Sequence, residues 1–148
     1  MKNKMWMWVL IVIVVVAGLV YVTQRGNMPK ENAMQVEGVK ITVLQEGAGE
    51  VAKAGDVVSM NYTGKLTDGT VFDSNIDPKF NHVEPFTFNL GAGQVIKGWD
   101  TAIVGMKVGE KRVLEIEPAY AYGEQGIGPI PPNSTLIFEV ELLAINNQ

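Results

Sequence analysis

The sequence predicts an α+β fold in which one short helix lies across a curved antiparallel β-sheet, preceded by one transmembrane helix at the N-terminus. Three observations carry this prediction. In the soluble part, apolar residues recur at helical spacing only in residues 91–105, whereas the other folded segments alternate polar and apolar residues as strands do. Residues 5–22 are apolar throughout. With 148 residues, the chain has room for one domain.

The N-terminal apolar run, Met5–Val22, contains no charged side chain. Its 18 residues would extend roughly 27 Å as a helix, about the thickness of the hydrocarbon core of a bilayer. Trp6 and Tyr21 lie near its two ends, where aromatic rings favour the headgroup region. Because Lys2 and Lys4 precede the run, the positive-inside rule keeps the N-terminus in the cytoplasm and exports the rest of the chain.

A cleaved signal peptide is the alternative interpretation of this run. The apolar part of a signal peptide is usually about 7 to 15 residues long and ends in a small-x-small cleavage site. The run here is longer, and residues 18–23 lack such a site. We therefore expect an uncleaved signal anchor at residues 1–25, a polar linker at 26–37 and a folded domain at 38–148. Both interpretations make the folded domain periplasmic or extracellular.

The predicted helix lies between Gly93 and Gly105, because glycine next to an apolar stripe is a typical stop signal. A helix this short is marginal alone, so it must pack on the sheet. The residues that form its apolar stripe recur every three or four positions: Val95, Ile96, Trp99, Ala102, Ile103 and Met106.

The predicted strands occur on both sides of this helix in the sequence. Thr67–Thr70 contains an Asp-Gly pair, which indicates a tight turn between two of them. Residues 75–84 and 119–133 are expected to be loops, and a loop as long as the second is often functional. In chain order, we predict strands at residues 39–44, 57–64, 71–72, 86–90, 111–117 and 135–142, with apolar faces that include Val58, Met60, Tyr62, Leu114, Ile116, Leu136, Phe138, Val140 and Leu142.

The composition excludes several classes of site. The chain has no cysteine, which rules out disulfides, zinc-thiolate sites and thiol catalysis. Its single histidine, His82, cannot form a metal cluster, and we expect it to be solvated in its polar loop. From residue 33 onward there are 8 basic and 15 acidic side chains, a charge of −7, which argues against nucleic acid as a partner. No glycine-rich phosphate motif or nucleophile elbow occurs, so we predict no cofactor and no metal.

Large aromatic side chains come from almost every segment of the domain. One helix on a sheet of this size needs fewer large rings to fill its core, although a plain core remains the alternative explanation. If several rings converge where the helix begins, beside Val95 and Ile96, they would line an apolar pocket of the kind that binds small molecules or peptides. The rings are those of Tyr62, Phe72, Phe86, Phe88, Trp99, Tyr120, Tyr122 and Phe138.

Eight segments of the chain resemble the FKBP-type peptidyl-prolyl cis-trans isomerases, in the order and with nearly the spacing of that family. The resemblance covers residues 38–145. It implies a half-barrel of antiparallel sheet wrapped around one short helix, and we expect the membrane-anchored bacterial type. The segments are Val58-x-Met60-x-Tyr62-Thr63-Gly64, Asp68-Gly69-x-x-Phe72-Asp73-Ser74, Pro85-Phe86-x-Phe88-x-Leu90-Gly91, Val95-Ile96-x-Gly98-Trp99, Met106-x-x-Gly109, Tyr120-Ala121-Tyr122-Gly123, Ile130-Pro131-Pro132-Asn133 and Leu136-Ile137-Phe138-Glu139-Val140-Glu141-Leu142.

The resemblance also implies which residues form the pocket. Trp99 would be the floor beneath a proline ring, and Tyr62, Phe72 and Phe138 would be walls. The whole set of implied site residues is Tyr62, Phe72, Asp73, Phe86, Val95, Ile96, Trp99, Tyr122, Ile130 and Phe138.

Polar groups at the mouth of this pocket are implied as well. The hydroxyl of Tyr122 and the backbone N–H of Ile96 would hold substrate carbonyl groups, and Asp73 would be a carboxylate at the rim. Two departures from the family pattern border the mouth. The loop at residues 75–84 is longer than in compact members, and the tip at 124–129 is about one residue shorter. Both departures bear on substrate preference and inhibitor affinity more than on the activity.

The implied function is acceleration of X-Pro bond rotation during the folding of exported proteins, by desolvation and shape complementarity. Its partners would be proline-containing polypeptides and the membrane, with the macrolide inhibitors of the family as candidate ligands. A non-catalytic module that binds proline peptides, or a chaperone, is the alternative. We expect a monomer, since the apolar run has no small-xxx-small pattern beyond a lone Gly18.

Overall fold

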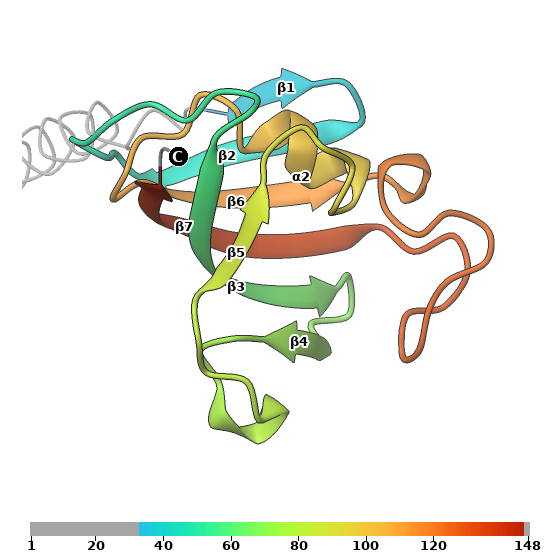
Figure 1. Cartoon of the computed structure of the whole chain (residues 1–148). Coiled ribbons are helices and arrows are strands. Elements are labelled where there is room, and N and C mark those ends of the chain that lie inside the picture. The colour runs from blue at the N-terminus through green and yellow to red at the C-terminus, as the bar shows by residue number, and fades with distance from the viewer. Residues whose placement is uncertain (1–32, 147–148) are drawn as a thin grey trace, which may run out of the picture. The chain divides into compact units, whose positions relative to one another are not determined.

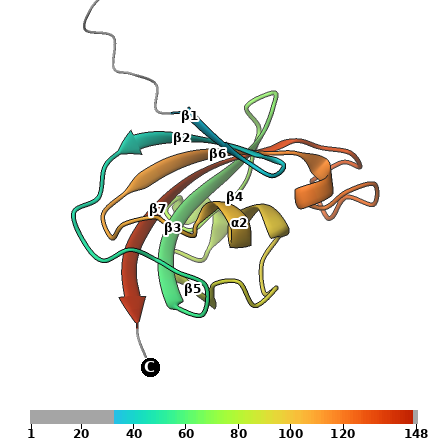
Figure 2. The ribbon, with the colours of Figure 1, turned by 90° about the horizontal axis from the view of Figure 1, so that it is seen from above.

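Seven antiparallel strands form one curved sheet, and helix α2 (Lys97–Ala102) lies on its concave side (Figures 1 and 2). The structure is a computed structural model that describes residues 33–146. The predicted α+β fold, a curved antiparallel sheet with one short helix, is confirmed. The strands are β1 (Ala33–Val36), β2 (Val39–Gln45), β3 (Val57–Leu66), β4 (Val71–Ser74), β5 (Phe86–Asn89), β6 (Lys111–Ile116) and β7 (Leu136–Asn146).

The order of the strands across the sheet is β1-β2-β6-β7-β3-β4, and β5 also pairs with β3. Strand β3 therefore has different neighbours along its length. One edge pairs with β7 throughout, whereas the other pairs with β5 near Val58 and with β4 near Gly64. The register between β3 and β7 shifts at Ser59 and Met60, and such an irregularity increases the local bend of a strand. This bend lets the sheet curve around α2.

The apolar faces predicted for the strands form the core. Val58 and Met60 of β3, together with Leu114 and Ile116 of β6, are fully buried. The alternating residues of β7, Leu136, Phe138, Val140 and Leu142, are at most 5 % exposed. Alternate side chains of a strand point to opposite faces of the sheet. The apolar row therefore packs against the helix, while the residues between point toward solvent.

The helix is shorter than predicted, because only Lys97–Ala102 is helical. The carboxylate of Asp100 accepts hydrogen bonds from the backbone N–H groups of Gly91 (2.8 Å) and Gly93 (2.9 Å). These bonds hold the preceding segment in turns, and Ile96 is an extended N-cap with ψ of 149°. After the helix, Gly105 takes a φ of 86°, a left-handed conformation that favours glycine and stops propagation.

Close approach of the helix to the sheet depends on Gly98. A Cβ atom at this position would lie 2.5 Å from Cγ2 of Ile116, so any side chain would push α2 away from β6. Trp99 and Ala102 of the same helix are then buried against the sheet. The predicted apolar stripe is otherwise split: Val95 and Ile96 precede the helix, whereas Ile103 and Met106 follow it and are fully buried.

The predictions for residues 1–25 lie outside the described residues. Within residues 33–146, no helix is long and apolar enough to cross a membrane. The linker predicted at 26–37 is wrong over its last part, where Ala33–Val36 forms β1 and pairs with β2. This strand was missed because it is short and lies at the edge of the sheet, where its mostly exposed residues need no alternation of polarity.

Candidate active site

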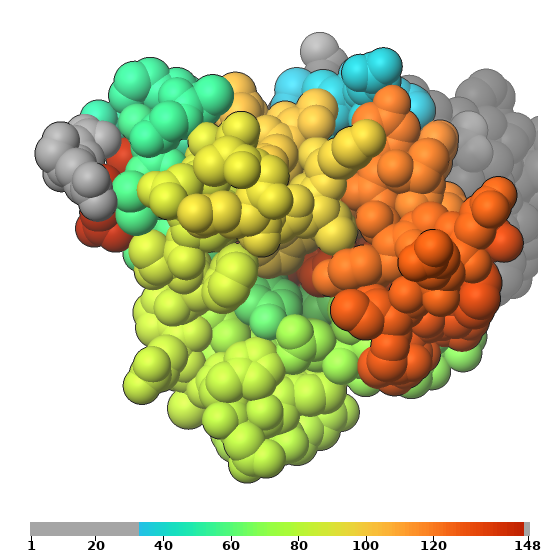
Figure 3. Space-filling view, turned by 45° about the vertical axis from the view of Figure 1, so that its right-hand side comes forward, coloured from blue at the N-terminus to red at the C-terminus, as the bar shows by residue number. Residues whose placement is uncertain are grey.

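A cavity of about 270 Å³ opens where α2 begins. In the space-filling view it is the hollow between the yellow segment that precedes α2 and the orange loop that follows β6 (Figure 3). Its lining comes from four strands, from α2 and from these two connecting segments, so residues far apart in the sequence meet here. They are Tyr62, Phe72, Asp73, Phe86, Gln94, Val95, Ile96, Trp99, Tyr122 and Phe138.

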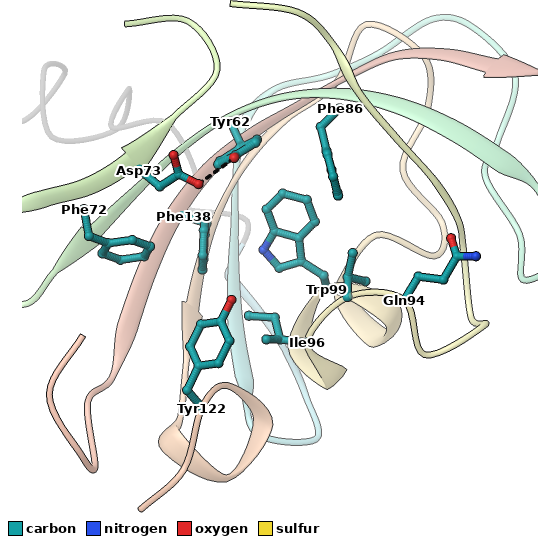
Figure 4. A pocket seen from close by; sticks show the side chains of 10 residues that line it. Tyr62, Phe72, Asp73, Phe86, Gln94, Ile96, Trp99, Tyr122 and Phe138 are labelled. Atoms are coloured by element: carbon teal, nitrogen blue, oxygen red, sulfur yellow. Dashed lines mark hydrogen bonds between the residues drawn. The ribbon is translucent and has the colours of Figure 1, made fainter. Parts of the chain in front are cut away.

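Trp99 lies at the base of the cavity, with its indole among the other lining side chains, and is only 4 % exposed (Figure 4). Three rings meet it nearly at right angles. The ring centroid of Phe138 lies 5.2 Å away, that of Tyr62 5.3 Å away and that of Phe86 6.1 Å away. Edge-to-face pairs of this kind stabilise by about 0.5–1.5 kcal/mol each beyond area burial. The rings therefore hold one another in place and form an apolar surface that exists before any ligand arrives.

The indole N–H of Trp99 is buried, and no hydrogen-bond partner for it occurs within the described part of the chain. In Figure 4 the nitrogen is turned toward Phe138. An N–H group directed at an aromatic ring makes a weak favourable contact. Because this nitrogen is buried, the base of the cavity presents mainly the carbon surface of the indole.

A glycine allows the wall beside Trp99 to form. A Cβ atom on Gly64 would lie 2.5 Å from Cζ of Phe72 and 2.7 Å from Cε1 of Phe138. Because Gly64 has no Cβ atom, the two rings lie over the backbone of β3 and meet edge to face with centroids 5.5 Å apart. Glycine at this position therefore positions two lining rings at once.

The polar group on one side of the cavity is the carboxylate of Asp73, which follows Phe72 in β4. The hydroxyl of Tyr62 donates a 2.7 Å hydrogen bond to Oδ2 of Asp73 (Figure 4). Burial, followed by this hydrogen bond, raises the pKa of Tyr62 well above its ordinary value. Tyr62 therefore stays neutral near pH 7, with its hydroxyl directed at the carboxylate and its ring directed at the indole.

Tyr122 covers the opposite side of the cavity from the loop after β6. Its hydroxyl points inward, toward the space between Phe138 and Ile96 (Figure 4). Burial, with a smaller contribution from the charge of Asp73, raises the pKa of Tyr122. The phenol is therefore protonated at neutral pH and can donate a hydrogen bond. Nearby, Ile96 precedes the helix, and the first N–H groups of any helix lack partners within it.

The side chain of Asn75 ties the long loop at residues 75–84 to strand β3, which lines the cavity. Asn75 is buried, and its side-chain nitrogen donates to the carbonyl oxygens of Met60 and Glu84, both at 2.9 Å. Its side-chain oxygen accepts the backbone N–H of Tyr62 at 2.7 Å. One side chain thus joins the start of the loop, its end and strand β3.

The histidine in this loop lies against the carboxylate of the cavity. Nε2 of His82 is 2.7 Å from Oδ1 of Asp73, while Oδ2 of the same carboxylate accepts the hydroxyl of Tyr62. The prediction that His82 is merely solvated is therefore wrong, although its side chain remains 46 % exposed. The length of the loop and its place at the mouth were the only sequence signals for this contact.

Comparison with known proteins identifies the family. The profile of a family described as "FKBP-type peptidyl-prolyl cis-trans isomerase" matches residues 49–143, more than half of the chain. The chain belongs to this family. It is 51 % identical over 107 residues to "FK506-binding protein 1" of Dictyostelium discoideum, covering 72 % of this chain and 96 % of the relative. It is 49 % identical over 113 residues to "Peptidyl-prolyl cis-trans isomerase" of Schizosaccharomyces pombe, covering 75 % and 97 %.

Other relatives are longer than this FKBP domain. The chain is 53 % identical over 111 residues to "FK506-binding protein 4" of Aspergillus fumigatus, but it spans only 22 % of that protein. All three relatives are eukaryotic, so they give no support to the bacterial, membrane-anchored type that the sequence led us to expect. The chain is an FKBP-type isomerase, and its activity is prolyl cis-trans isomerisation.

The FKBP cavity contains nine of the ten residues that the resemblance implied for the site. The exception is Ile130, which is 6 % exposed and belongs to the hydrophobic core without lining the cavity. A tight turn, in which the N–H of Ile130 bonds to the carbonyl of Ile127, directs this residue inward. Gln94 lines the cavity but was not predicted. Its side chain accepts the N–H of Asn89 at 2.9 Å, a structural contact that a lone glutamine in a sequence does not reveal.

Proposed function

We propose that this isomerase catalyses rotation about X-Pro bonds in the cavity over Trp99, by removing water from the amide and fitting its twisted form. The observation that carries the proposal is the ring of mutually fixed aromatic side chains around the indole, with hydrogen-bonding groups confined to the margin. The family supplies the reaction, and the geometry supports this place and this mechanism for it.

An apolar cavity suits this reaction for a physical reason. Rotation of a peptide bond has a barrier of about 18–20 kcal/mol, because the planar amide has partial C–N double-bond character. The planar form is more charge-separated than the twisted form, so water stabilises the ground state more than the transition state. A cavity that excludes water and fits the twisted amide binds the transition state better. Since each tenfold acceleration needs only about 1.4 kcal/mol, no acid, base or metal has to act.

The groups at the margin would orient the substrate. In this proposal the hydroxyl of Tyr122 and the backbone N–H of Ile96 donate to substrate carbonyl oxygens, while the proline ring rests on Trp99. The hydrogen bond between Asp73 and Tyr62 keeps the Tyr62 ring in contact with the indole. These contacts hold the residues on both sides of the proline in the geometry that rotation requires. Part of the binding energy therefore lowers the barrier to rotation.

The direct test is the cis-to-trans rate of a short X-Pro peptide in the presence of the full-length chain. Trp99→Leu keeps the floor apolar but removes the flat ring, and we expect it to lower kcat/KM at least about tenfold. Leu44→Ala is the matched control, because Leu44 is 54 % exposed on β2. Circular dichroism establishes that each variant is folded. If the folded wild type gave no acceleration, the alternative of a non-catalytic proline-binding module would replace this proposal.

We also propose that the domain is exported and held at a membrane by its N-terminal residues, where it serves the folding of exported proteins. The support is the apolar run Met5–Val22, with Lys2 and Lys4 before it. Uncatalysed proline isomerisation takes tens to hundreds of seconds, slow enough to limit folding. In cells expressing the full-length chain, the domain should sediment with membranes and be digested by protease added outside the cytoplasm. Protection from that protease would contradict export.

Macrolide binding is a further proposal. Two of the relatives are named as FK506-binding proteins, and the aromatic cavity here is open to a ligand of that kind. We expect FK506 to inhibit the isomerase competitively and to quench the fluorescence of Trp99. The long loop at residues 75–84 borders the mouth, so affinity would be the property in which this chain differs from compact relatives. Unchanged activity in saturating FK506 would contradict the proposal.

A further inference from the structure

We propose that His82 is a positioning residue of this isomerase: it holds the Asp73 carboxylate and, through it, the hydroxyl of Tyr62. The inference rests on the proposed site over Trp99. His82 belongs to the long loop at residues 75–84, does not line the cavity, and is the only histidine of the chain. Its role would therefore be indirect, through the carboxylate that it contacts.

The two oxygens of the carboxylate are held by different partners. Oδ2 accepts the Tyr62 hydroxyl at 2.7 Å, and Oδ1 accepts the backbone N–H of Ser74 at 2.9 Å and lies 2.7 Å from Nε2 of His82. The Ser74 bond comes from the adjacent residue and restrains the carboxyl plane only weakly. His82 supplies the restraint from outside β4, so the direction in which Oδ2 faces Tyr62 depends on it.

Tyr62 transmits this restraint to the cavity. Its hydroxyl is tied to Asp73, and its ring lies edge-on to Trp99 with centroids 5.3 Å apart. A carboxylate free to rotate would let the Tyr62 ring move away from the indole. The contact chain from His82 to Asp73, Tyr62 and Trp99 therefore links a loop outside the cavity to its floor.

The loop is built to present the histidine. Ser74 and Asp77 shape its first half: Oγ of Ser74 accepts the N–H groups of Ile76 and Asp77, and the Asp77 side chain caps the short helix η1 (Pro78–Phe80). Asn81 then takes a φ of 60°, which reverses the chain just before His82. Asparagine tolerates this left-handed conformation better than most residues. The histidine is thus placed by a defined backbone rather than by a chance contact.

The charges around the imidazole favour this pairing. The carboxylate of Asp73 on β4 faces it. The phenol of Tyr62 on β3 is bonded to that carboxylate and the phenol of Tyr122 lies across the cavity, and both have raised pKa values and are neutral. Within the loop itself, the charges of Asp77 and Lys79 offset each other at 3.6 Å. An imidazole can donate a hydrogen bond to a carboxylate whether it is neutral or protonated.

The test combines kinetics of the full-length chain with conservative replacement. We expect His82→Ala to lower kcat/KM about fivefold, the effect of losing one hydrogen bond. In His82→Gln the amide nitrogen can take the place of Nε2, so most of the activity should return. Val83→Ala, at an exposed neighbour in the same loop, is the control that should behave as wild type.

A double-mutant cycle decides whether the effect passes through Asp73. In an Asp73→Asn background, His82→Ala should cost little further activity. The ¹³C signal of the Tyr62 ring carbon that bears the hydroxyl should shift in His82→Ala and remain near its wild-type position in His82→Gln. The inference is overturned if His82→Ala leaves both kcat/KM and this signal unchanged, or if its loss persists in full in the Asp73→Asn background. Because the NMR signal does not require turnover, an inactive wild type would refute the proposed function alone.

Discussion

Nη1 of Arg112 donates a 2.7 Å hydrogen bond to the carbonyl oxygen of Ala102, which joins strand β6 to the last residue of α2. Arg112 is 5 % exposed and pairs with Glu110, which is 3 % exposed. The carbonyl groups at the end of a helix have no partners within it, and a guanidinium meets both that need and the partial negative charge there. The helix that carries Trp99, the floor of the cavity, is therefore anchored at its C-terminal end by a buried ion pair.

Arg112→Met should destabilise the protein strongly. It removes the helix contact and leaves the buried carboxylate of Glu110 without a counter-charge, a change that typically costs about 3–5 kcal/mol. Denaturant unfolding measures the loss. Glu110→Gln combined with Arg112→Met should recover part of it, because the uncompensated charge is then gone. Lys111→Met, at the neighbouring half-exposed position, should change the free energy of unfolding by less than about 1 kcal/mol.

Gly64→Ala should displace two of the rings that line the cavity. The added methyl group would overlap the rings of Phe72 and Phe138, so we expect a loss of about 1–3 kcal/mol in stability and a lower kcat/KM. Adding Phe72→Leu should recover stability by making room, while the wall stays incomplete and activity stays low. Wild-type stability and kinetics in Gly64→Ala alone would show that the two rings are not held by contact with this backbone.

Asp100→Ala should affect catalysis more than stability. The carboxylate holds the N–H groups of Gly91 and Gly93, and the segment between them and the helix carries Val95 and Ile96. Without these bonds the segment should be more mobile, with faster amide exchange at residues 91–96 and kcat/KM lower by several-fold. Thr101→Ala on the same exposed side is the control, since its hydroxyl bonds only to the carbonyl of Lys97 within the helix. Equal exchange rates in wild type and Asp100→Ala would contradict this reasoning.

The raised pKa of Tyr62 predicts sensitivity to alkali. A group whose pKa is higher in the folded than in the unfolded state contributes stability that is present below its ordinary pKa of 10.0 and is lost as the pH rises through the folded value. The free energy of unfolding should therefore fall above about pH 10. Tyr62→Phe should flatten that fall while lowering stability at pH 7, where the bond to Asp73 is lost. The difference in phenolate absorbance between the wild type and Tyr62→Phe isolates this titration, because the chain has four tyrosines. An identical alkaline slope in Tyr62→Phe would refute the assignment.

Much of the fold follows from local patterns in the sequence. Alternation placed the strands, and Leu114, Ile116 and the apolar row of β7 are buried as predicted. The same parity puts Arg112 on the inward face, but no local rule indicates that it would meet Glu110 and the end of a helix. The helix was predicted too long because its apolar spacing continues past both ends. Hydrogen bonds that Asp100 accepts from Gly91 and Gly93 limit the helix at its start, and the left-handed Gly105 ends it.

The sequence by itself determined the sheet, the presence of one short helix, the family and nine of the ten cavity residues expected from the resemblance. These follow from side-chain periodicity and from motifs that are local along the chain. Only the tertiary structure decided that Ile130 lies in the core, that Gln94 lines the cavity and that His82 contacts Asp73. Such contacts depend on where a loop returns in space, which is set by distant hydrogen bonds such as those of Asn75 and not by the residues next to it.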